Sequence, residues 1–166
     1  MRVLFVRHAV ALEREEFLED DMLRPLSAEG KTKAAKVFGV YKQLFPKPDL
    51  IVSSEAVRAK ETAELLSAAF EHAKTLITPL LNPGADFNAF KKLIASLDHK
   101  HGCIAVVGHE PDFSLIIGTA LTGGGILYLN VKKASCIEVE LGREGRGELK
   151  SMMTPKQALK FKGKHV

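Results

Sequence analysis

The sequence contains no tryptophan and only two tyrosines among its 166 residues, so a flat aromatic platform of the kind that binds sugars is not expected. Its two cysteines, Cys103 and Cys136, each lie in an apolar run, which predicts buried thiols rather than a disulfide framework or a metal pair. The apolar run at the start of the chain breaks at Arg7, too early for a signal peptide core or a membrane span. These absences favour a cytoplasmic protein that does not enter a membrane.

The composition is that of a soluble globular domain, with 46% hydrophobic and 27% charged residues. The formal net charge of +4 favours anionic partners such as phosphate groups. Part of this charge lies in residues 156–166, which we interpret as a solvated basic tail after a domain spanning residues 1–155. We favour this interpretation over a nucleic-acid-binding arm. No long apolar stripe stands out for self-association, so we expect a monomer.

Short apolar runs alternate with amphipathic segments along the chain. The runs predict buried strands at residues 3–6, 50–52, 75–78 and 103–107, and the segments predict helices at residues 27–45, 55–70, 87–97 and after Pro111. Residues 135–141 alternate like an amphipathic edge strand, and a weaker strand follows at residues 148–153. This order predicts an α/β fold with three layers, α/β/α, around a mostly parallel central sheet with antiparallel C-terminal strands.

Polar residues stand at the carboxyl ends of three of the predicted strands. Arg7 and His8 follow the first, Ser53 and Ser54 the second, and Gly108 and His109 the fourth. In open parallel sheets, ligands bind in the crevice beyond these strand ends. We therefore expect one site that contains both histidines, Arg7, and Arg58 from the helix after Ser54. These positive groups repel one another unless an anion fills the site.

A phosphoryl group suits such a site, because guanidinium groups match phosphate oxygens in bidentate geometry. Neighbouring arginines are expected to lower the pKa of His8 by like-charge repulsion, which leaves a neutral ring whose lone pair can attack phosphorus. The other ring nitrogen is expected to donate to a backbone carbonyl, which sets the tautomer. Arg7, Arg58 and His109 would then hold the phosphoryl oxygens.

Four ordered segments of the chain resemble motifs of the histidine phosphatase superfamily, which has the phosphoglycerate mutase-like fold. They are residues 6–9 (VRHA), 24–30 (RPLSAEG), 53–63 (SSEAVRAKETA) and 107–111 (VGHEP). The resemblance runs from Val3 to about Leu141, and the short chain with its RPLS segment is most similar to SixA-type phosphohistidine phosphatases. The resemblance implies that His8 is the phosphoryl acceptor. It also implies a phosphate pocket formed by Arg7, Arg58 and His109, and supporting contacts from Arg24 and Ser135.

Two positions depart from the pattern of that family. Ala9 stands where many relatives have glycine, although alanine also fits the SixA-type pattern. Phosphoglycerate mutase-like enzymes carry a glutamate as general acid after the second helix, whereas this chain has no glutamate between Glu71 and Glu110. Asp86 is a possible substitute in contact with substrate. Its position directly before Phe87 favours a different interpretation, a helix N-cap.

The absence of this glutamate general acid influences which substrate we expect. An alkoxide leaving group gains much from protonation, whereas an imidazole leaving from a P–N bond is easier to expel. We therefore hypothesise a phosphatase that acts on phosphohistidine of a signalling protein, such as a histidine-containing phosphotransfer domain. Two alternatives stay open. One is a phosphomonoesterase or mutase of the same fold with a small phosphorylated substrate, and the other is a non-catalytic phosphate-binding module.

The acidic stretch at residues 13–21 allows two interpretations. It is a solvated loop or short helix, or it is a rim segment that helps to select substrates, as loops at strand ends commonly do. The remaining histidines lie in polar, lysine-containing surroundings and show no metal-ligand spacing. We therefore expect no metal and no cofactor.

Overall fold

The structure is a computed structural model that describes residues 1–97, 101–125, 127–142 and 146–161. These residues form one sheet with the strand order β3-β2-β4-β1-β5-β6. Pairing is parallel from β3 through β2 and β4 to β1, and antiparallel from β1 through β5 to β6. The strands are β1 (Arg2–Arg7), β2 (Leu50–Ser53), β3 (Thr75–Ile77), β4 (Cys103–Gly108), β5 (Cys136–Leu141) and β6 (Gly147–Met153).

Helices connect the strands in the order that the sequence predicted. The α-helices are α1 (Ala28–Leu44), α2 (Val57–Ala69), α3 (Phe87–Ser96), α4 (Asp112–Thr122) and α5 (Pro155–Phe161). Three short 3-10 helices are η1 (Arg14–Glu16), η2 (Asp21–Leu23) and η3 (Pro79–Leu81). Helix α1 begins where the Ser27 side chain accepts a hydrogen bond from Gly30 N, as expected of an N-cap serine. Among the described residues, every helix is too short or too polar to cross a membrane.

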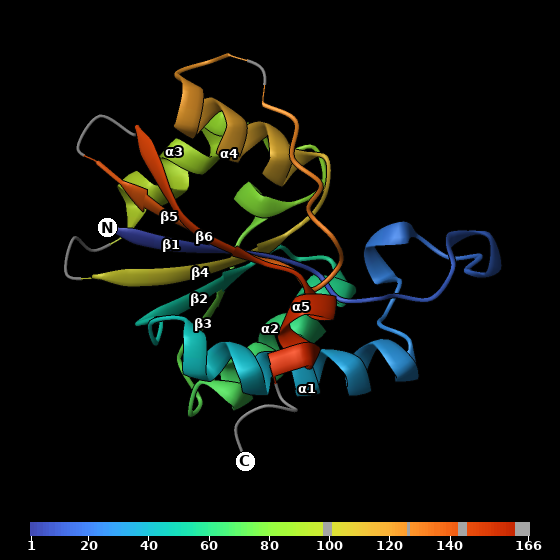
Figure 1. The fold of residues 1–166 in the computed structure, drawn as a ribbon. Coiled ribbons are helices and arrows are strands. Elements are labelled where there is room, and N and C mark those ends of the chain that lie inside the picture. The colour runs from blue at the N-terminus through green and yellow to red at the C-terminus, as the bar shows by residue number, and fades with distance from the viewer. Residues whose placement is uncertain (98–100, 126, 143–145, 162–166) are drawn as a thin grey trace.

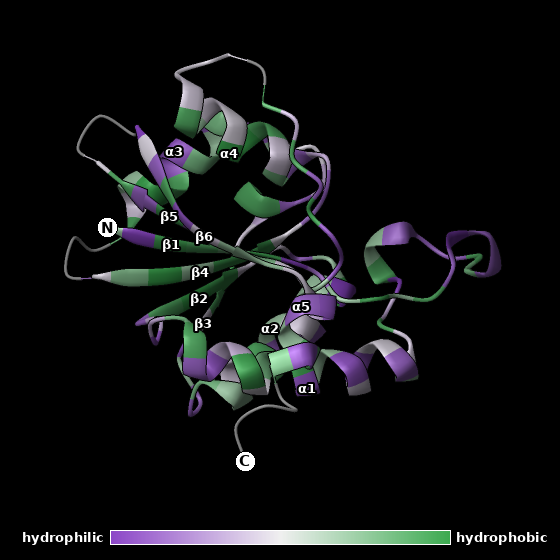
Figure 2. Cartoon of the chain, viewed as in Figure 1, coloured by the Kyte–Doolittle hydropathy of each residue, from purple (hydrophilic) through white to green (hydrophobic). Residues whose placement is uncertain are grey.

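The sheet lies between two layers of helices. Helices α1, α2 and α5 cover one face, and α3 and α4 cover the other (Figure 1). Successive side chains of β1 alternate between the two resulting cores, so that Leu4 and Val6 pack with α1 whereas Val3 and Phe5 pack with α3 and α4. The central strands are therefore apolar on both faces, while the helices carry their hydrophilic residues outward (Figure 2). This arrangement confirms the predicted three-layer α/β/α fold.

The expectation of an edge strand at residues 135–141 is wrong. Strand β5 lies between β1 and β6, and most of its side chains are buried. Its alternating pattern arises from two glutamates: Glu140 is exposed, whereas Glu138 is buried and has two polar partners. The Glu138 carboxylate accepts a hydrogen bond from Ser151 Oγ at 3.1 Å and lies 3.6 Å from Arg2 Nε. The edge strand on this side of the sheet is β6.

The C-terminal segment also differs from its prediction as a solvated tail that begins at residue 156. Helix α5 packs against α1, and its Ala158 side chain is fully buried. Pro155 occupies the first position of the helix, where its missing N–H is tolerated. Residues 162–166, the remainder of the predicted tail, lie outside the described residues.

The chain that leaves β1 is held tightly against the start of α1. Ser27 N donates to Val10 O at 3.0 Å, and Ala11 forms an isolated antiparallel bridge with Leu26. A Cβ atom on Gly30 would lie 2.0 Å from Val10 O, so only glycine permits this approach. The backbone on both sides of His8 is thereby fixed, by β1 before it and by α1 after it.

Tyr41 of α1 joins two distant segments of the chain. Its buried hydroxyl lies 2.9 Å from Ala134 O and 3.0 Å from Met153 O. We expect Tyr41→Phe to lower the free energy of unfolding by about 1–2 kcal/mol, because buried carbonyl oxygens lose their donor. Urea denaturation measures this loss. The control is Tyr128→Phe, at a side chain that is 91% exposed, and an equally small effect of both substitutions would contradict the assignment.

Candidate active site

Backbone pairing brings the ends of three strands together. Arg7 of β1 lies opposite Gly108 of β4, and Ser53 of β2 lies opposite Val107. Just beyond these strands, His8 N donates to Gly108 O and Ser54 N donates to Val107 O, each at 3.0 Å. The polar residues that the sequence placed at strand ends therefore meet at one edge of the sheet.

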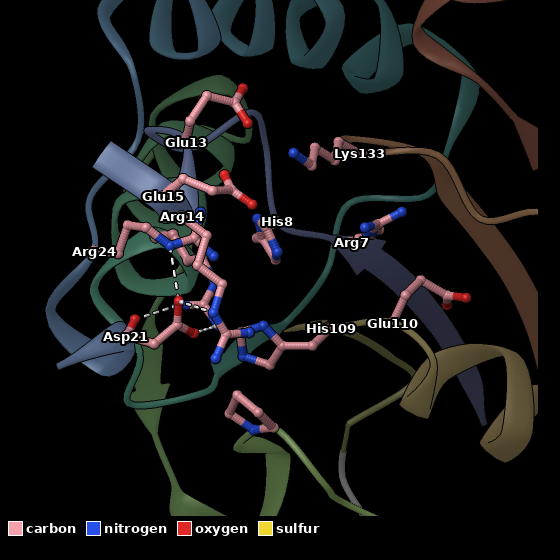
Figure 3. Close-up of a pocket in the computed structure, with 12 residues that line it drawn as sticks. Arg7, His8, Glu13, Arg14, Glu15, Asp21, Arg24, His109, Glu110 and Lys133 are labelled. Atoms are coloured by element: carbon pink, nitrogen blue, oxygen red, sulfur yellow. Dashed lines mark hydrogen bonds and ion pairs between the residues drawn. The ribbon is translucent and has the colours of Figure 1, made fainter. Parts of the chain in front are cut away.

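A pocket of about 330 Å³ opens at this edge (Figure 3). Five of its lining residues were predicted from the sequence; they are Arg7, His8, Arg24, Arg58 and His109. The others are Glu13, Arg14, Glu15, Asp21, Pro83, Glu110 and Lys133. Most lining side chains are charged, so the pocket is suited to a small charged ligand.

His8 is buried with its tautomer set by the backbone. Its Nδ1 lies 2.7 Å from Ala9 O, and since a carbonyl only accepts, Nδ1 carries the hydrogen and Nε2 the lone pair. The pKa of His8 is lowered to about 3, chiefly by burial. The hydrogen bond with Ala9 O opposes this shift, and the neighbouring His109, Arg58 and Arg7 act in the same direction as burial. This agrees with the expectation of a neutral ring. Its main cause is burial rather than the like-charge repulsion that the sequence suggested.

His109 lies beside His8, with ring centroids 5.2 Å apart. Its Nε2 lies 2.9 Å from Ser54 Oγ, whereas its buried Nδ1 has no partner among the described residues. Burial lowers the pKa of His109 to about 3, assisted mainly by Arg58. Both imidazoles are therefore neutral in the free protein at neutral pH.

An aspartate holds two of the arginines in place. Arg58 Nη1 donates to Asp21 O at 2.6 Å, and Arg58 Nη2 lies 3.0 Å from Asp21 Oδ2. Arg24 Nε donates to Asp21 Oδ1 at 2.8 Å. Although partial burial opposes ionisation of Asp21, the hydrogen bond from Arg24 and the charge of Arg58 lower its pKa. Arg7 is held separately, through a hydrogen bond of 2.7 Å from Nη1 to Val131 O.

Within the described residues, four buried polar side-chain atoms have no hydrogen-bond partner. They are Arg7 Nε, Arg58 Nε, His109 Nδ1 and Ser135 Oγ. Unpaired buried polar groups are rare and costly in folded proteins. Three of the four belong to pocket-lining residues, so the protein holds unpaired polar atoms around the position that an anion would occupy.

Two predicted contact residues lie elsewhere. Asp86 is not among the pocket-lining residues, and its side chain caps α3 by accepting from Ala89 N at 2.8 Å. This confirms the N-cap interpretation. Ser135 is buried beneath the site, where its carbonyl accepts from Arg7 N at 3.2 Å. Its side chain does not line the pocket.

The acidic stretch at residues 13–21 forms part of the pocket wall. Glu13 and Glu15 reach the pocket from around η1, and Asp21 from η2. The stretch therefore lies at the rim of the pocket, and we call it the rim segment; that it helps to select substrates stays a prediction. Sequence reasoning missed its individual contacts, and the only signal was its run of charge. Among the described residues, no three side chains of the kinds that bind metals come together to hold an ion.

The pocket places several arginines next to a buried, neutral histidine at the carboxyl ends of the central strands. The family model described as "Histidine phosphatase superfamily (branch 1)" matches residues 3–82. An uncharacterized protein of Picosynechococcus sp. is 32% identical over 146 residues, with 86% of each chain covered.

Solved structures share the fold. The protein histidine phosphatase SixA complexed with tungstate has a TM-score of 0.83 at 20% identity, over 94% of this chain and 98% of that chain. The alpha-ribazole phosphatase from Shigella flexneri has a TM-score of 0.70 at 16% identity, over 93% and 97%. The chain belongs to the histidine phosphatase superfamily, and this membership supports a phosphatase activity.

Burial of two neutral histidines makes stability depend on pH. Because the unfolded chain binds these protons at the ordinary pKa of 6.5 and the folded chain only at about 3, stability falls as pH is lowered between these values, by up to about 1.4 kcal/mol per pH unit for each histidine. We expect His8→Asn to remove the part of this decrease in the free energy of unfolding that is due to His8, about 2 kcal/mol at pH 5. Urea unfolding at about pH 7 and pH 5 measures it.

The control for this measurement is His72→Asn, at an exposed position outside the pocket. It should leave the pH dependence of the wild-type protein intact. A difference between wild type and His8→Asn that stays constant from pH 7 to pH 5 would show that His8 is not held neutral by the fold.

Proposed function

We propose that the protein is a phosphatase that forms a covalent phosphohistidine at His8. The observation that carries this proposal is the buried, neutral His8 ring, whose Nδ1 is committed to Ala9 O and whose Nε2 keeps a lone pair. This nitrogen attacks phosphorus, a P–N bond forms, and the bond to the leaving group breaks with its electron pair. The leaving group takes a proton from solvent. Water then attacks the same phosphorus, the P–N bond breaks with its electron pair returning to His8 Nε2, and phosphate is released while the proton lost by the water goes to solvent.

The polar side chains around His8 stabilise the transferring group. Arg7 and Arg58 offer unpaired Nε atoms, and His109 faces the pocket next to the nucleophile. Phosphoryl transfer relies on positioning and charge stabilisation rather than on covalent help from several groups. We assign Arg7, Arg58 and His109 to the phosphoryl oxygens, with Arg24 as a support that acts with Asp21. The reaction needs no cofactor.

We further propose that the substrate is phosphohistidine on a protein, such as a histidine-containing phosphotransfer domain. Asp86 is occupied as a helix cap. Asp21 is occupied by arginines, and Glu110 accepts hydrogen bonds from Ser114 N and Oγ. Asp21 and Glu110 thus accept hydrogen bonds instead of offering a proton to the leaving group. A leaving imidazole needs such a proton less than a leaving alkoxide does. Glu13 and Glu15 are exposed on the rim segment, where a protein-borne phosphoryl group approaches.

Substitution of the proposed nucleophile tests the catalytic assignment. We expect His8→Ala to lower turnover by about 10³-fold or more, because the covalent route is lost. The wild-type protein should trap ³²P from a labelled substrate in an acid-labile form, and the variant should trap none. His72→Ala serves as the matched control. Retained turnover in His8→Ala would refute the assignment, and turnover without a trapped intermediate would favour direct attack by water.

A substrate panel tests the proposed specificity. We expect the kcat/KM for a phosphohistidine protein to exceed that for 3-phosphoglycerate and p-nitrophenyl phosphate, because the P–N bond needs less protonation of its leaving group. Phosphate release is measured for all three at equal protein concentration. A preference for 3-phosphoglycerate would instead identify a small-molecule phosphomonoesterase of the same fold.

A further inference from the structure

A chain of hydrogen bonds leads from the surface to His109. Its outer end is Asn82, which follows η3. Asn82 Nδ2 donates to Glu55 Oε2 at 2.8 Å, and Glu55 N donates to Asn82 Oδ1 at 2.9 Å. These two contacts set the orientation of the amide, because only its nitrogen can donate to the carboxylate. The amide oxygen therefore faces Ser54.

Ser54 is the middle of the chain, and its single hydrogen is already used. Its Oγ lies 3.0 Å from Asn82 Oδ1, an atom that only accepts, so the hydroxyl must donate there. Ser54 Oγ in turn accepts from Ala56 N at 3.2 Å. Toward His109 Nε2, at 2.9 Å, the hydroxyl can therefore only accept. It follows that His109 carries a hydrogen on Nε2.

The tautomer of His109 has a consequence at the pocket. A neutral ring with its hydrogen on Nε2 has a lone pair on Nδ1, and Nδ1 is the buried atom without a partner among the described residues. A lone pair repels a phosphoryl oxygen. His109 can donate to such an oxygen from Nδ1 only after it takes up a proton there.

We propose that Ser54 and Asn82 are positioning residues that couple anion binding to the uptake of one proton at His109 Nδ1. This inference rests on the proposed phosphoryl pocket. A tetrahedral dianion enters, a proton from solvent adds to Nδ1, and the resulting imidazolium donates to an anion oxygen while Nε2–H still donates to Ser54. When the anion leaves, the proton leaves with it.

The charged groups around His109 support this coupling. The groups that face it are His8, Arg7, Arg24, Arg58 and Asp21. In the free pocket, burial and the arginines keep the ring neutral. A bound dianion offsets the arginine charges and favours the imidazolium. His8 does not compete for this role, because its Nδ1–H is held by Ala9 O and its Nε2 faces the reacting phosphorus in the proposed reaction.

Calorimetric titration with inorganic sulfate tests the proposal, because sulfate remains a dianion near neutral pH and any proton taken up goes to the protein. Titrations in two buffers with different ionisation enthalpies count the protons. We expect the wild-type protein to take up about one proton per sulfate, with affinity that rises about tenfold per pH unit as pH falls near neutrality. Ring ¹⁵N shifts should place the new proton on His109 Nδ1.

Two variants separate positioning from mere stability. In Ser54→Ala the His109 ring loses the acceptor of Nε2–H, and in Asn82→Ala the Ser54 hydroxyl is free to turn its hydrogen toward the ring. Both allow the Nδ1–H tautomer, which donates without taking up a proton. In both variants we expect sulfate binding to take up less than about half a proton, and sulfate affinity to depend less steeply on pH. Ser96→Ala is the control, since Ser96 Oγ donates to Leu93 O on α3 and Ser96 does not line the pocket.

The outcomes distinguish this proposal from the function on which it rests. Sulfate that binds wild type without proton uptake, or with equal uptake in wild type and both variants, would overturn the coupling and leave the phosphatase proposal standing. Sulfate that neither binds nor competes with substrate would overturn the phosphoryl pocket, and the coupling with it.

Discussion

The site depends on one register, the pairing of Arg7 with Gly108 between β1 and β4. Because Arg7 and Gly108 are paired, the residues that follow them, His8 and His109, lie side by side, with ring centroids 5.2 Å apart. Glycine is required at residue 108, because a Cβ there would lie 2.7 Å from the ring of Phe113 on α4. The close approach of α4 thus holds the end of β4 in place. A slip of β1 by one residue against β4 would turn the β1 side chains to the opposite faces of the sheet and move His8 away from His109.

The electrostatics of the pocket follow from this geometry. Arginines and buried histidines would destabilise the fold if all of them were charged, and the protein avoids this in two ways. Burial keeps both imidazoles neutral, and Asp21 provides a counter-charge for Arg58 and Arg24. The donors are held in position before any ligand arrives, so little reorganisation is needed when an anion binds.

Much of the fold could be predicted from the sequence because its signals are local. The apolar run of β1, the Ser27 cap and the polar residues at strand ends each depend on a few neighbouring residues. The structure was needed wherever contacts between distant segments determine the environment of a side chain. Asp21 meets Arg58 only after the rim segment folds back, and Glu138 looks exposed until Ser151 and Arg2 are placed beside it. The cause of the low His8 pKa was missed for the same reason, since burial depends on distant segments.

The contact between Arg58 and Asp21 gives one side chain two tasks. Arg58 anchors the rim segment through the Asp21 backbone and carboxylate, and it also presents an unpaired Nε at the proposed phosphoryl site. The shape of the entrance and the proposed chemistry within it therefore depend on the same side chain. A change at Asp21 would therefore disturb the entrance and the proposed phosphoryl site together.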